Sequence, residues 1–128
     1  MSDREVVRTE AAPAPYQGAP YSQAIKAGGF VFVSGQLGVD TNGDIRGSTI
    51  VEQTEQIFSN LRAILEAAGS GLDRLVKTTV FLQNLDDFPA MNEVYGRHVG
   101  DRPPARSTVE VARLPAGVLA EIDAIALL

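Results

Sequence analysis

The spacing of apolar residues along the chain predicts that strands and helices alternate. Four apolar residues, Phe30 to Val33, follow the glycine pair at 28–29, and their types are typical of a strand that is buried on both faces. Asn42-Gly43 is a strong hairpin signal because both residues tolerate positive φ. Residues 75–82 form a second run of β-forming residues. These runs predict a sheet as the centre of the fold.

The strongest helical pattern begins after Thr49. Thr49 and Glu52 have the spacing of a capping box, and Gly69 stands where a glycine commonly ends a helix. Between them, one stripe with helical period holds Ile50, Ile57, Leu61, Ile64, Leu65 and Ala68. A shorter helix is predicted after the aspartates at 86–87, with an inner face made of Phe88, Met91 and Tyr95.

The order of elements predicts an α+β fold, with one mixed sheet and two helices packed on one face. Residues 107–112 and 119–127 are interpreted as an antiparallel hairpin. Residues 1–15 are polar and aperiodic, so we expect an N-terminal arm, 1–15, followed by a single domain, 16–128. Two helices can cover only one face, while several strands are apolar on both. We therefore expect another copy of the chain to cover the second face.

Composition narrows the classes of function. The chain has 128 residues, 45% of them hydrophobic, which suits one ordinary domain. It has no cysteine and one histidine, which excludes disulfides and thiolate nucleophiles and argues against a zinc site. A net charge of −5 argues against binding to nucleic acid or to an anionic membrane. No apolar stretch approaches the length of a membrane span or a secretory signal, so we expect a cytoplasmic protein.

Few residues remain that could carry chemistry. His98 is interpreted as a cation at the end of the short helix. Arg106 opens a strand after two prolines, and an odd-sum hairpin register would place Arg106, Thr108 and Glu110 on one face with Glu121 and Asp123. Charges there are costly unless they are paired or lie in a wet cleft. Spacing alone leaves a wet cleft and a solvated sheet face as equal alternatives.

Four further residues have an ordinary structural explanation when each is taken alone. Tyr21 would be a half-buried aromatic residue near a strand, and Asn92 an amide on a helix surface. Ser34 and Gly35 would be small residues that a strand end requires. None of the four predicts a site by itself.

Several segments together resemble the Rid family, also called the YjgF/YER057c/UK114 family. The most specific segment is 103–115, with the sequence PPARSTVEVARLP. The others are APYSQA at 19–24, VSGQ at 33–36, VKTTVFL at 76–82 and EIDA at 121–124. The resemblance runs in register over nearly the whole chain and omits only the N-terminal arm.

The resemblance implies a chorismate-mutase-like α+β fold that assembles as a homotrimer with sites at the subunit interfaces. It also implies a deaminase that hydrolyses reactive enamines and imines, 2-aminoacrylate/2-iminopropanoate and 2-iminobutanoate, to 2-oxo acids and ammonia without a metal or cofactor. A non-enzymatic trimer that binds small carboxylates, as a regulator or a chaperone-like protein, is the alternative. Ribonuclease activity, ascribed to some relatives, fits poorly with the negative charge and single histidine.

The resemblance also implies roles for residues. Arg106 matches the arginine that binds the substrate carboxylate, and Glu121 matches the carboxylate that positions the attacking water. Thr108 stands where the family often has cysteine, at a position expected to act through its backbone carbonyl. The pocket-lining residues of the family match Tyr21, Ser34, Gly35 and Asn92.

Overall fold

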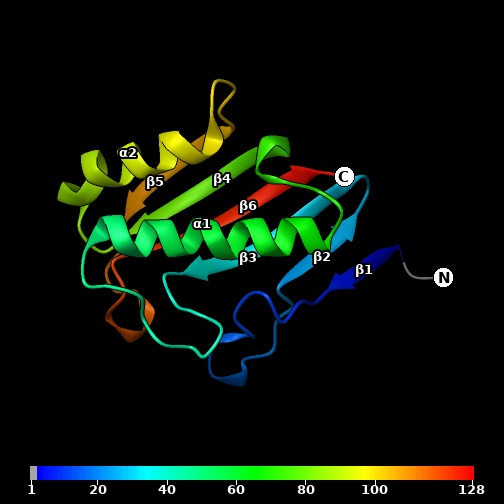
Figure 1. Cartoon of the computed structure of the whole chain (residues 1–128), viewed down its shortest axis with the longest axis horizontal. Coiled ribbons are helices and arrows are strands. Elements are labelled where there is room, and N and C mark those ends of the chain that lie inside the picture. The colour runs from blue at the N-terminus through cyan, green and yellow to red at the C-terminus, as the bar shows by residue number, and fades with distance from the viewer. Residues whose placement is uncertain (1–2) are drawn as a thin grey trace.

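The computed structural model describes residues 3–128, in which one mixed sheet is covered by two α-helices on one face (Figure 1). This confirms the predicted α+β class. The helices are α1 (Ile50–Ala67) and α2 (Phe88–Val99), and single 3-10 turns occur at 16–18, 72–74, 85–87 and 115–117. The sheet has the order β1-β2-β3-β6-β4-β5. Its strands are β1 (Arg4–Val7), β2 (Ala24–Ala27), β3 (Phe30–Leu37), β4 (Leu75–Leu82), β5 (Ala105–Glu110) and β6 (Ala120–Leu127).

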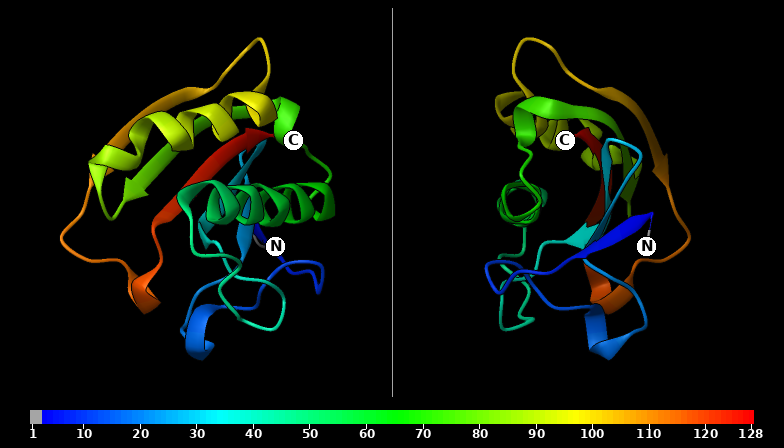
Figure 2. Two further views of the ribbon diagram at one scale, coloured as in Figure 1. Left: turned by 60° about the vertical axis from the view of Figure 1, so that its left-hand side comes forward. Right: turned by 90° about the vertical axis from the view of Figure 1, so that its right-hand side faces the viewer.

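The strand directions explain why both helices lie on the same face. β3 and β4 are both antiparallel to β6, which lies between them, and β4 is parallel to β5. α1 therefore joins β3 to β4, and α2 joins β4 to β5, as crossovers between strands of one direction. Such crossovers carry a helix over the sheet with a fixed hand. Figure 2 shows that the other face of the sheet has no helix against it.

Local sequence signals define the ends of α1 as predicted. The Thr49 side chain accepts a hydrogen bond from the backbone N–H of Glu52, and the Glu52 carboxylate accepts one from the backbone N–H of Thr49. After the helix, Gly69 has φ 87°, and the N–H of Ser70 donates to the carbonyl of Leu65. The capping box and the helix-ending glycine are both confirmed.

The main core lies between the helices and the sheet. Ile57, Phe58 and Leu61 of α1 are fully buried. Burial of each such side chain stabilises the folded state by roughly 1.5–3 kcal/mol. Beneath the helices, β6 presents small residues at alternate positions, and these let the helix layer approach closely. They are Ala120, Ala124 and Ala126.

Part of the expected N-terminal arm, 1–15, belongs to the sheet, and its first two residues lie outside the described residues. Arg4–Val7 forms an edge strand that pairs with β2, with Val6 opposite Ile25, and Val7 is buried. A strand of four residues is too short to show a periodic pattern. Charged residues such as Arg4 and Glu5 are also typical of sheet edges, where they discourage pairing with other chains.

The predicted C-terminal hairpin is wrong. β5 and β6 do not pair, because β4 lies between them: Thr78 stands opposite both Arg106 and Ala124, and Phe81 stands opposite Glu121. The buried residues of β6 suit a central strand, whereas the more exposed β5 suits an edge. Since successive side chains alternate between faces, Arg106 and Glu121 project from opposite faces of the sheet. Arg106, Thr108 and Glu110 therefore do not share a face with Glu121 and Asp123.

The face without helices is partly apolar, as the sequence predicted. Phe32 and Val109 lie on it and are each 43% exposed. Phe32 stands opposite Ile25 and Ile125 on the two neighbouring strands. Within residues 3–128, no helix combines the length and the apolar character that crossing a membrane would require.

Candidate functional site

The first group of candidate residues surrounds Arg106 on the helix-covered side of the sheet. The central carbon of its guanidinium lies 4.7 Å from the centre of the Tyr95 ring and 5.4 Å from that of Phe88. Between residues 3 and 128, no carboxylate forms an ion pair with Arg106. A half-buried guanidinium without an internal carboxylate is suited to bind an external one through its planar fork.

Two buried polar atoms beside Arg106 also lack a hydrogen-bond partner in the described part of the chain. They are Oδ1 of Asn92 and Oγ1 of Thr108. Thr108 is two residues from Arg106 and so points to the same face of β5. Asn92 lies one turn from both Phe88 and Tyr95 on α2. Such atoms cost about 1–3 kcal/mol unless water or a ligand binds them. We call Arg106, Asn92 and Thr108 the arginine cluster.

The second group lines a pocket of about 340 Å³ on the opposite side of the sheet. It brings together four of the predicted residues, Tyr21, Ser34, Gly35 and Glu121. We call this the glutamate pocket. Its other lining residues are Tyr16, Ala19, Leu37 and Pro115.

A β-bulge shapes this pocket. Val33 stands opposite Ala124 and Gln36 opposite Ile122, so Ser34 and Gly35 together face the single residue Asp123. The hydroxyl of Ser34 donates a hydrogen bond of 2.6 Å to the carbonyl of Ser22, which fixes the bulge to the segment that leads into β2. Bulges commonly re-aim side chains at functional sites. Here the bulge brings the backbone of Gly35 against the Glu121 carboxylate.

The surroundings of Glu121 favour its protonated form. Burial raises the pKa of the Glu121 carboxyl above its ordinary value, and the nearby negative charge of Asp123 raises it further. A carboxyl group with a raised pKa exchanges protons more readily near neutral pH, which suits a general acid or base.

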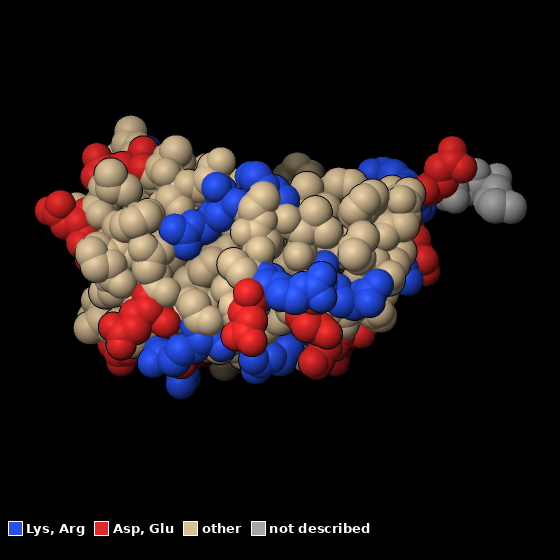
Figure 3. All heavy atoms as spheres, turned by 90° about the horizontal axis from the view of Figure 1, so that it is seen from above, with Lys and Arg blue, Asp and Glu red and all other residues tan. Residues whose placement is uncertain are grey.

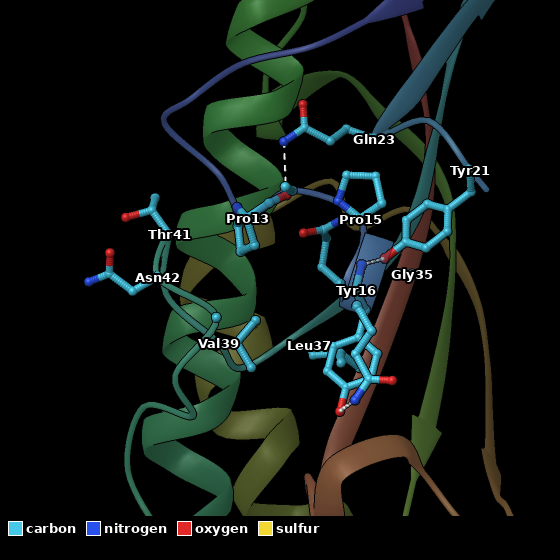
Figure 4. A pocket seen from close by; sticks show the side chains of 14 residues that line it. Pro13, Pro15, Tyr16, Tyr21, Gln23, Gly35, Leu37, Val39, Thr41 and Asn42 are labelled. Carbon is cyan, nitrogen blue, oxygen red and sulfur yellow. Dashed lines mark hydrogen bonds between the residues drawn. The ribbon is translucent and has the colours of Figure 1, made fainter. Parts of the chain in front are cut away.

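Tyr21 forms one wall of the glutamate pocket. Its hydroxyl oxygen accepts a hydrogen bond of 2.6 Å from the backbone N–H of Tyr16 (Figure 4). Both tyrosines, with Gly35 and Leu37, also line an adjacent pocket of about 420 Å³. The side chain of Tyr21 is therefore held in place by the turn that carries Tyr16.

Tyr16 and Pro115 line the glutamate pocket but were not predicted from the sequence. Each stands beside a non-glycine residue of positive φ: Gln17 has φ 53° and Ala116 has φ 57°. Strained backbone of this kind is often found at functional sites. Glutamine and alanine are not residue types that indicate a positive φ, so nothing in the sequence indicated strain at Gln17 and Ala116.

Other titratable residues lie outside both groups. The His98 ring stacks on Phe58 with 4.6 Å between ring centres and pairs with Glu55. Glu110 accepts a hydrogen bond from the backbone N–H of Leu85. No cluster of three or more metal-binding side chains occurs within residues 3–128.

The predicted site residues thus form two groups that the sheet separates. Residues 9–128 match a family model described as Endoribonuclease L-PSP. The chain belongs to the Rid family. It is 52% identical over 124 residues to the RutC family protein PH0854 of Pyrococcus horikoshii, which covers 96% of this chain and 97% of that protein.

Two further relatives are a named enzyme and a protein with a crystal structure. The 2-iminobutanoate/2-iminopropanoate deaminase of Dermatophagoides farinae is 40% identical, over 98% of this chain and 97% of that protein. The crystal structure of RidA from the Antarctic bacterium Psychrobacter sp. PAMC 21119 is 42% identical, with a TM-score of 0.91, over 97% of this chain and 99% of that one. Both likenesses extend over the strands and helices that carry the two groups.

Proposed function

We propose that this Rid chain hydrolyses 2-iminopropanoate and 2-iminobutanoate, formed from their enamines, to 2-oxo acids and ammonia. The observation that carries the proposal is the Arg106 guanidinium, which has no ion-pair carboxylate among residues 3–128 and lies beside unpartnered atoms of Asn92 and Thr108. A small substrate with a carboxylate and an adjacent polar group supplies what this cluster lacks. The deaminase name of the Dermatophagoides relative supports the same reaction class.

The proposed chemistry needs positioning and proton transfer. Arg106 binds the carboxylate through two parallel hydrogen bonds and so fixes the imine carbon. The imine reacts with its nitrogen protonated, and the Glu121 carboxylate accepts a proton as water adds to the imine carbon, which gives a neutral carbinolamine. Return of that proton to nitrogen makes ammonia the leaving group. The C–N bond then breaks as the C=O bond forms, and the hydroxyl proton passes back to Glu121. An imine is already electrophilic, so no cofactor is invoked.

The separation of the two groups bears on assembly. Within one chain the sheet stands between the arginine cluster and the glutamate pocket, so one copy cannot place both on one small substrate. We propose a homotrimer in which the arginine cluster of one subunit meets the glutamate pocket of its neighbour. The apolar residues on the helix-free face, such as Phe32 and Val109, would be covered in that assembly.

Two other activities would use the chain differently. A carboxylate-binding regulator would use Arg106 without releasing ammonia. An endoribonuclease, the activity named in the family description, needs a surface that attracts phosphates. The net charge is −5, and basic and acidic groups are interspersed on the face that Figure 3 shows. That distribution favours a small substrate over RNA.

The test couples the purified protein to a serine or threonine dehydratase that generates the imine in the assay. We expect 2-oxo acid and ammonia to form faster than in the uncatalysed reaction, and the chain to leave RNA intact. The proposal fails if ammonia release is not accelerated. Carboxylate binding without acceleration would support the regulator instead.

A further inference from the structure

We propose that Tyr95 is a positioning residue, which together with Phe88 forms an aromatic slot that holds the Arg106 guanidinium ready for a carboxylate. The inference rests on the proposed function in one respect: the carboxylate belongs to the substrate. It adds a role for two residues of α2 that the sequence pattern assigned only to the inner face of a helix.

The slot is built from two adjoining elements. Tyr95 and Phe88 are seven residues apart on α2, which is close to two helical turns, so both rings project from one side of the helix. Arg106 lies on β5, and its guanidinium carbon is within the ~6 Å that a cation–π contact requires from both ring centres, at 4.7 and 5.4 Å. Both rings therefore restrict the position of a long and otherwise flexible side chain.

The Tyr95 ring is itself fixed. Its hydroxyl lies 2.6 Å from Oγ1 of Thr78, and both residues are buried, at 5% and 0% exposure. Phe58 of α1 contacts the ring edge-on, with 5.5 Å between centres and 80° between planes. Thr78 also stands directly opposite Arg106 in the β4–β5 register, so the group that anchors Tyr95 lies beside the arginine that Tyr95 holds.

The slot orients the cation without pairing it with a carboxylate of the described chain. A ring interacts with the charge of the guanidinium, whereas a carboxylate from the chain would occupy its N–H groups. In the described part of the chain no acidic side chain pairs with Arg106. Burial raises the pKa of the Tyr95 hydroxyl, so this residue remains neutral and does not become an anionic partner. The N–H groups that do not contact the Tyr95 hydroxyl are left for a ligand.

The test separates the ring from its hydroxyl. Tyr95→Leu and Phe88→Leu each remove a ring, while Tyr95→Phe keeps the ring and loses the hydroxyl with its hydrogen bonds to Thr78 and Arg106. Two readouts are compared: calorimetric binding of 2-oxobutanoate, a stable carboxylate, and kcat and KM for imine hydrolysis. We expect Tyr95→Leu to weaken 2-oxobutanoate binding and raise KM about tenfold, Tyr95→Phe to have a smaller effect, and kcat to change less than KM.

Leu65→Ala is the matched control, because it removes a fully buried side chain of α1 that is outside the slot. It should lower the melting temperature and leave carboxylate binding unchanged. The slot is refuted if folded Tyr95→Leu and Phe88→Leu bind 2-oxobutanoate within twofold of the unmodified protein. If Tyr95→Leu does not fold, the binding data of Phe88→Leu and Tyr95→Phe decide whether the slot exists. Phe88 is 36% exposed, so its truncation should not prevent folding.

The two proposals fail in different ways. If the unmodified chain binds 2-oxobutanoate but does not hydrolyse the imine, the deaminase function is wrong. The binding data alone then decide whether the slot positions Arg106. If hydrolysis proceeds but the slot variants keep their KM and affinity, the slot is wrong and the function stands. Absence of both 2-oxobutanoate binding and imine hydrolysis overturns both.

Discussion

Gly35 and Glu121 approach each other so closely that a Cβ atom on residue 35 would lie 2.1 Å from Oε2 of Glu121. Gly35 is not among the glycines with positive φ, so the site uses its missing side chain and not its backbone freedom. The backbone of the bulge therefore forms a surface against which the carboxylate packs. Any side chain at this position must displace the carboxylate or the strand.

Gly35→Ala should therefore lower the rate by moving Glu121. A misplacement of about 1 Å can cost up to roughly 100-fold, so we expect kcat to fall about 10- to 100-fold. The affinity for 2-oxobutanoate should change less, because Arg106, which binds the carboxylate, belongs to the arginine cluster on the other side of the sheet. Steady-state kinetics and calorimetry measure both quantities.

Gly96→Ala is the matched control for this substitution. Gly96 is exposed on α2, and a Cβ there would meet no atom within 4 Å. It should retain full activity and gain up to about 1 kcal/mol of stability, because alanine favours a helix over glycine. If Gly35→Ala keeps the kcat of the unmodified protein, the position of Glu121 does not matter to the reaction.

Glu121→Gln should change how stability depends on pH. The raised pKa of Glu121 means that the folded protein binds more protons than the unfolded chain above the ordinary value of 4.5. The free energy of unfolding therefore falls as pH rises through the interval between the ordinary and the folded pKa. Glutamine does not titrate, so the variant should gain stability relative to the unmodified protein as pH rises above the ordinary pKa of 4.5. Denaturation at equal protein concentration measures this difference, and parallel pH profiles would contradict it.

Much of the fold is encoded in short stretches of sequence. Thr49, Glu52 and Gly69 define the ends of α1 through contacts within a few residues of each end. The partners of a strand are not encoded in this way. β5 and β6 each have a readable pattern, but the insertion of β4 between them depends on packing of the whole sheet.

The candidate site residues were predicted from the sequence, but their arrangement was predicted wrongly. Arg106 and Glu121 were both candidates, yet the face on which each lies depends on strand pairing, and the wrong hairpin placed them together. Tyr95 was correctly predicted on the inner face of α2. Its contact with Arg106 could not be, because it joins a helix and a strand through tertiary packing alone.

Asn60→Ala should destabilise the end of β3, where Leu37 lines the glutamate pocket. The buried Asn60 amide donates hydrogen bonds of 3.0 and 2.9 Å to the carbonyls of Leu37 and Val39. Each carbonyl left unsatisfied costs about 1–3 kcal/mol, and chemical denaturation measures the loss. Gln56→Ala is the control, because it removes only the bond from Gln56 to Asn60 and should cost less. Equal losses would show that the two carbonyls are not the cause.

Arg106→Ala should abolish measurable deamination, and Arg106→Lys should impair it severely. One charge-assisted contact is worth about 1.5–3 kcal/mol, and each ~1.36 kcal/mol is tenfold in rate. Lysine keeps the charge but loses the planar fork. Circular dichroism and gel filtration should show unchanged folding and assembly. Hydrolysis by Arg106→Ala at a near-normal rate would show that the site is misassigned, and failure to fold would make the residue structural.

The last prediction tests whether two subunits share one site. Arg106→Ala and Glu121→Gln should each be inactive as pure proteins. In mixed trimers made by co-expression, a site is intact when one subunit supplies Arg106 and its neighbour supplies Glu121. Random assembly in equal amounts makes about one quarter of the sites intact, so we expect about a quarter of the normal activity.

A pair of variants from the same cluster is the control for that mixing. Arg106→Ala and Asn92→Ala both damage the arginine cluster, so every site in their mixed trimers keeps one defect. Their activity should not exceed the average of the two pure proteins. Recovery only in the first mixture would support the proposal that Arg106 and Glu121, which project from opposite faces of one sheet, act from different copies. No recovery in either mixture would place the reaction within one chain, and the proposed interface site would be wrong.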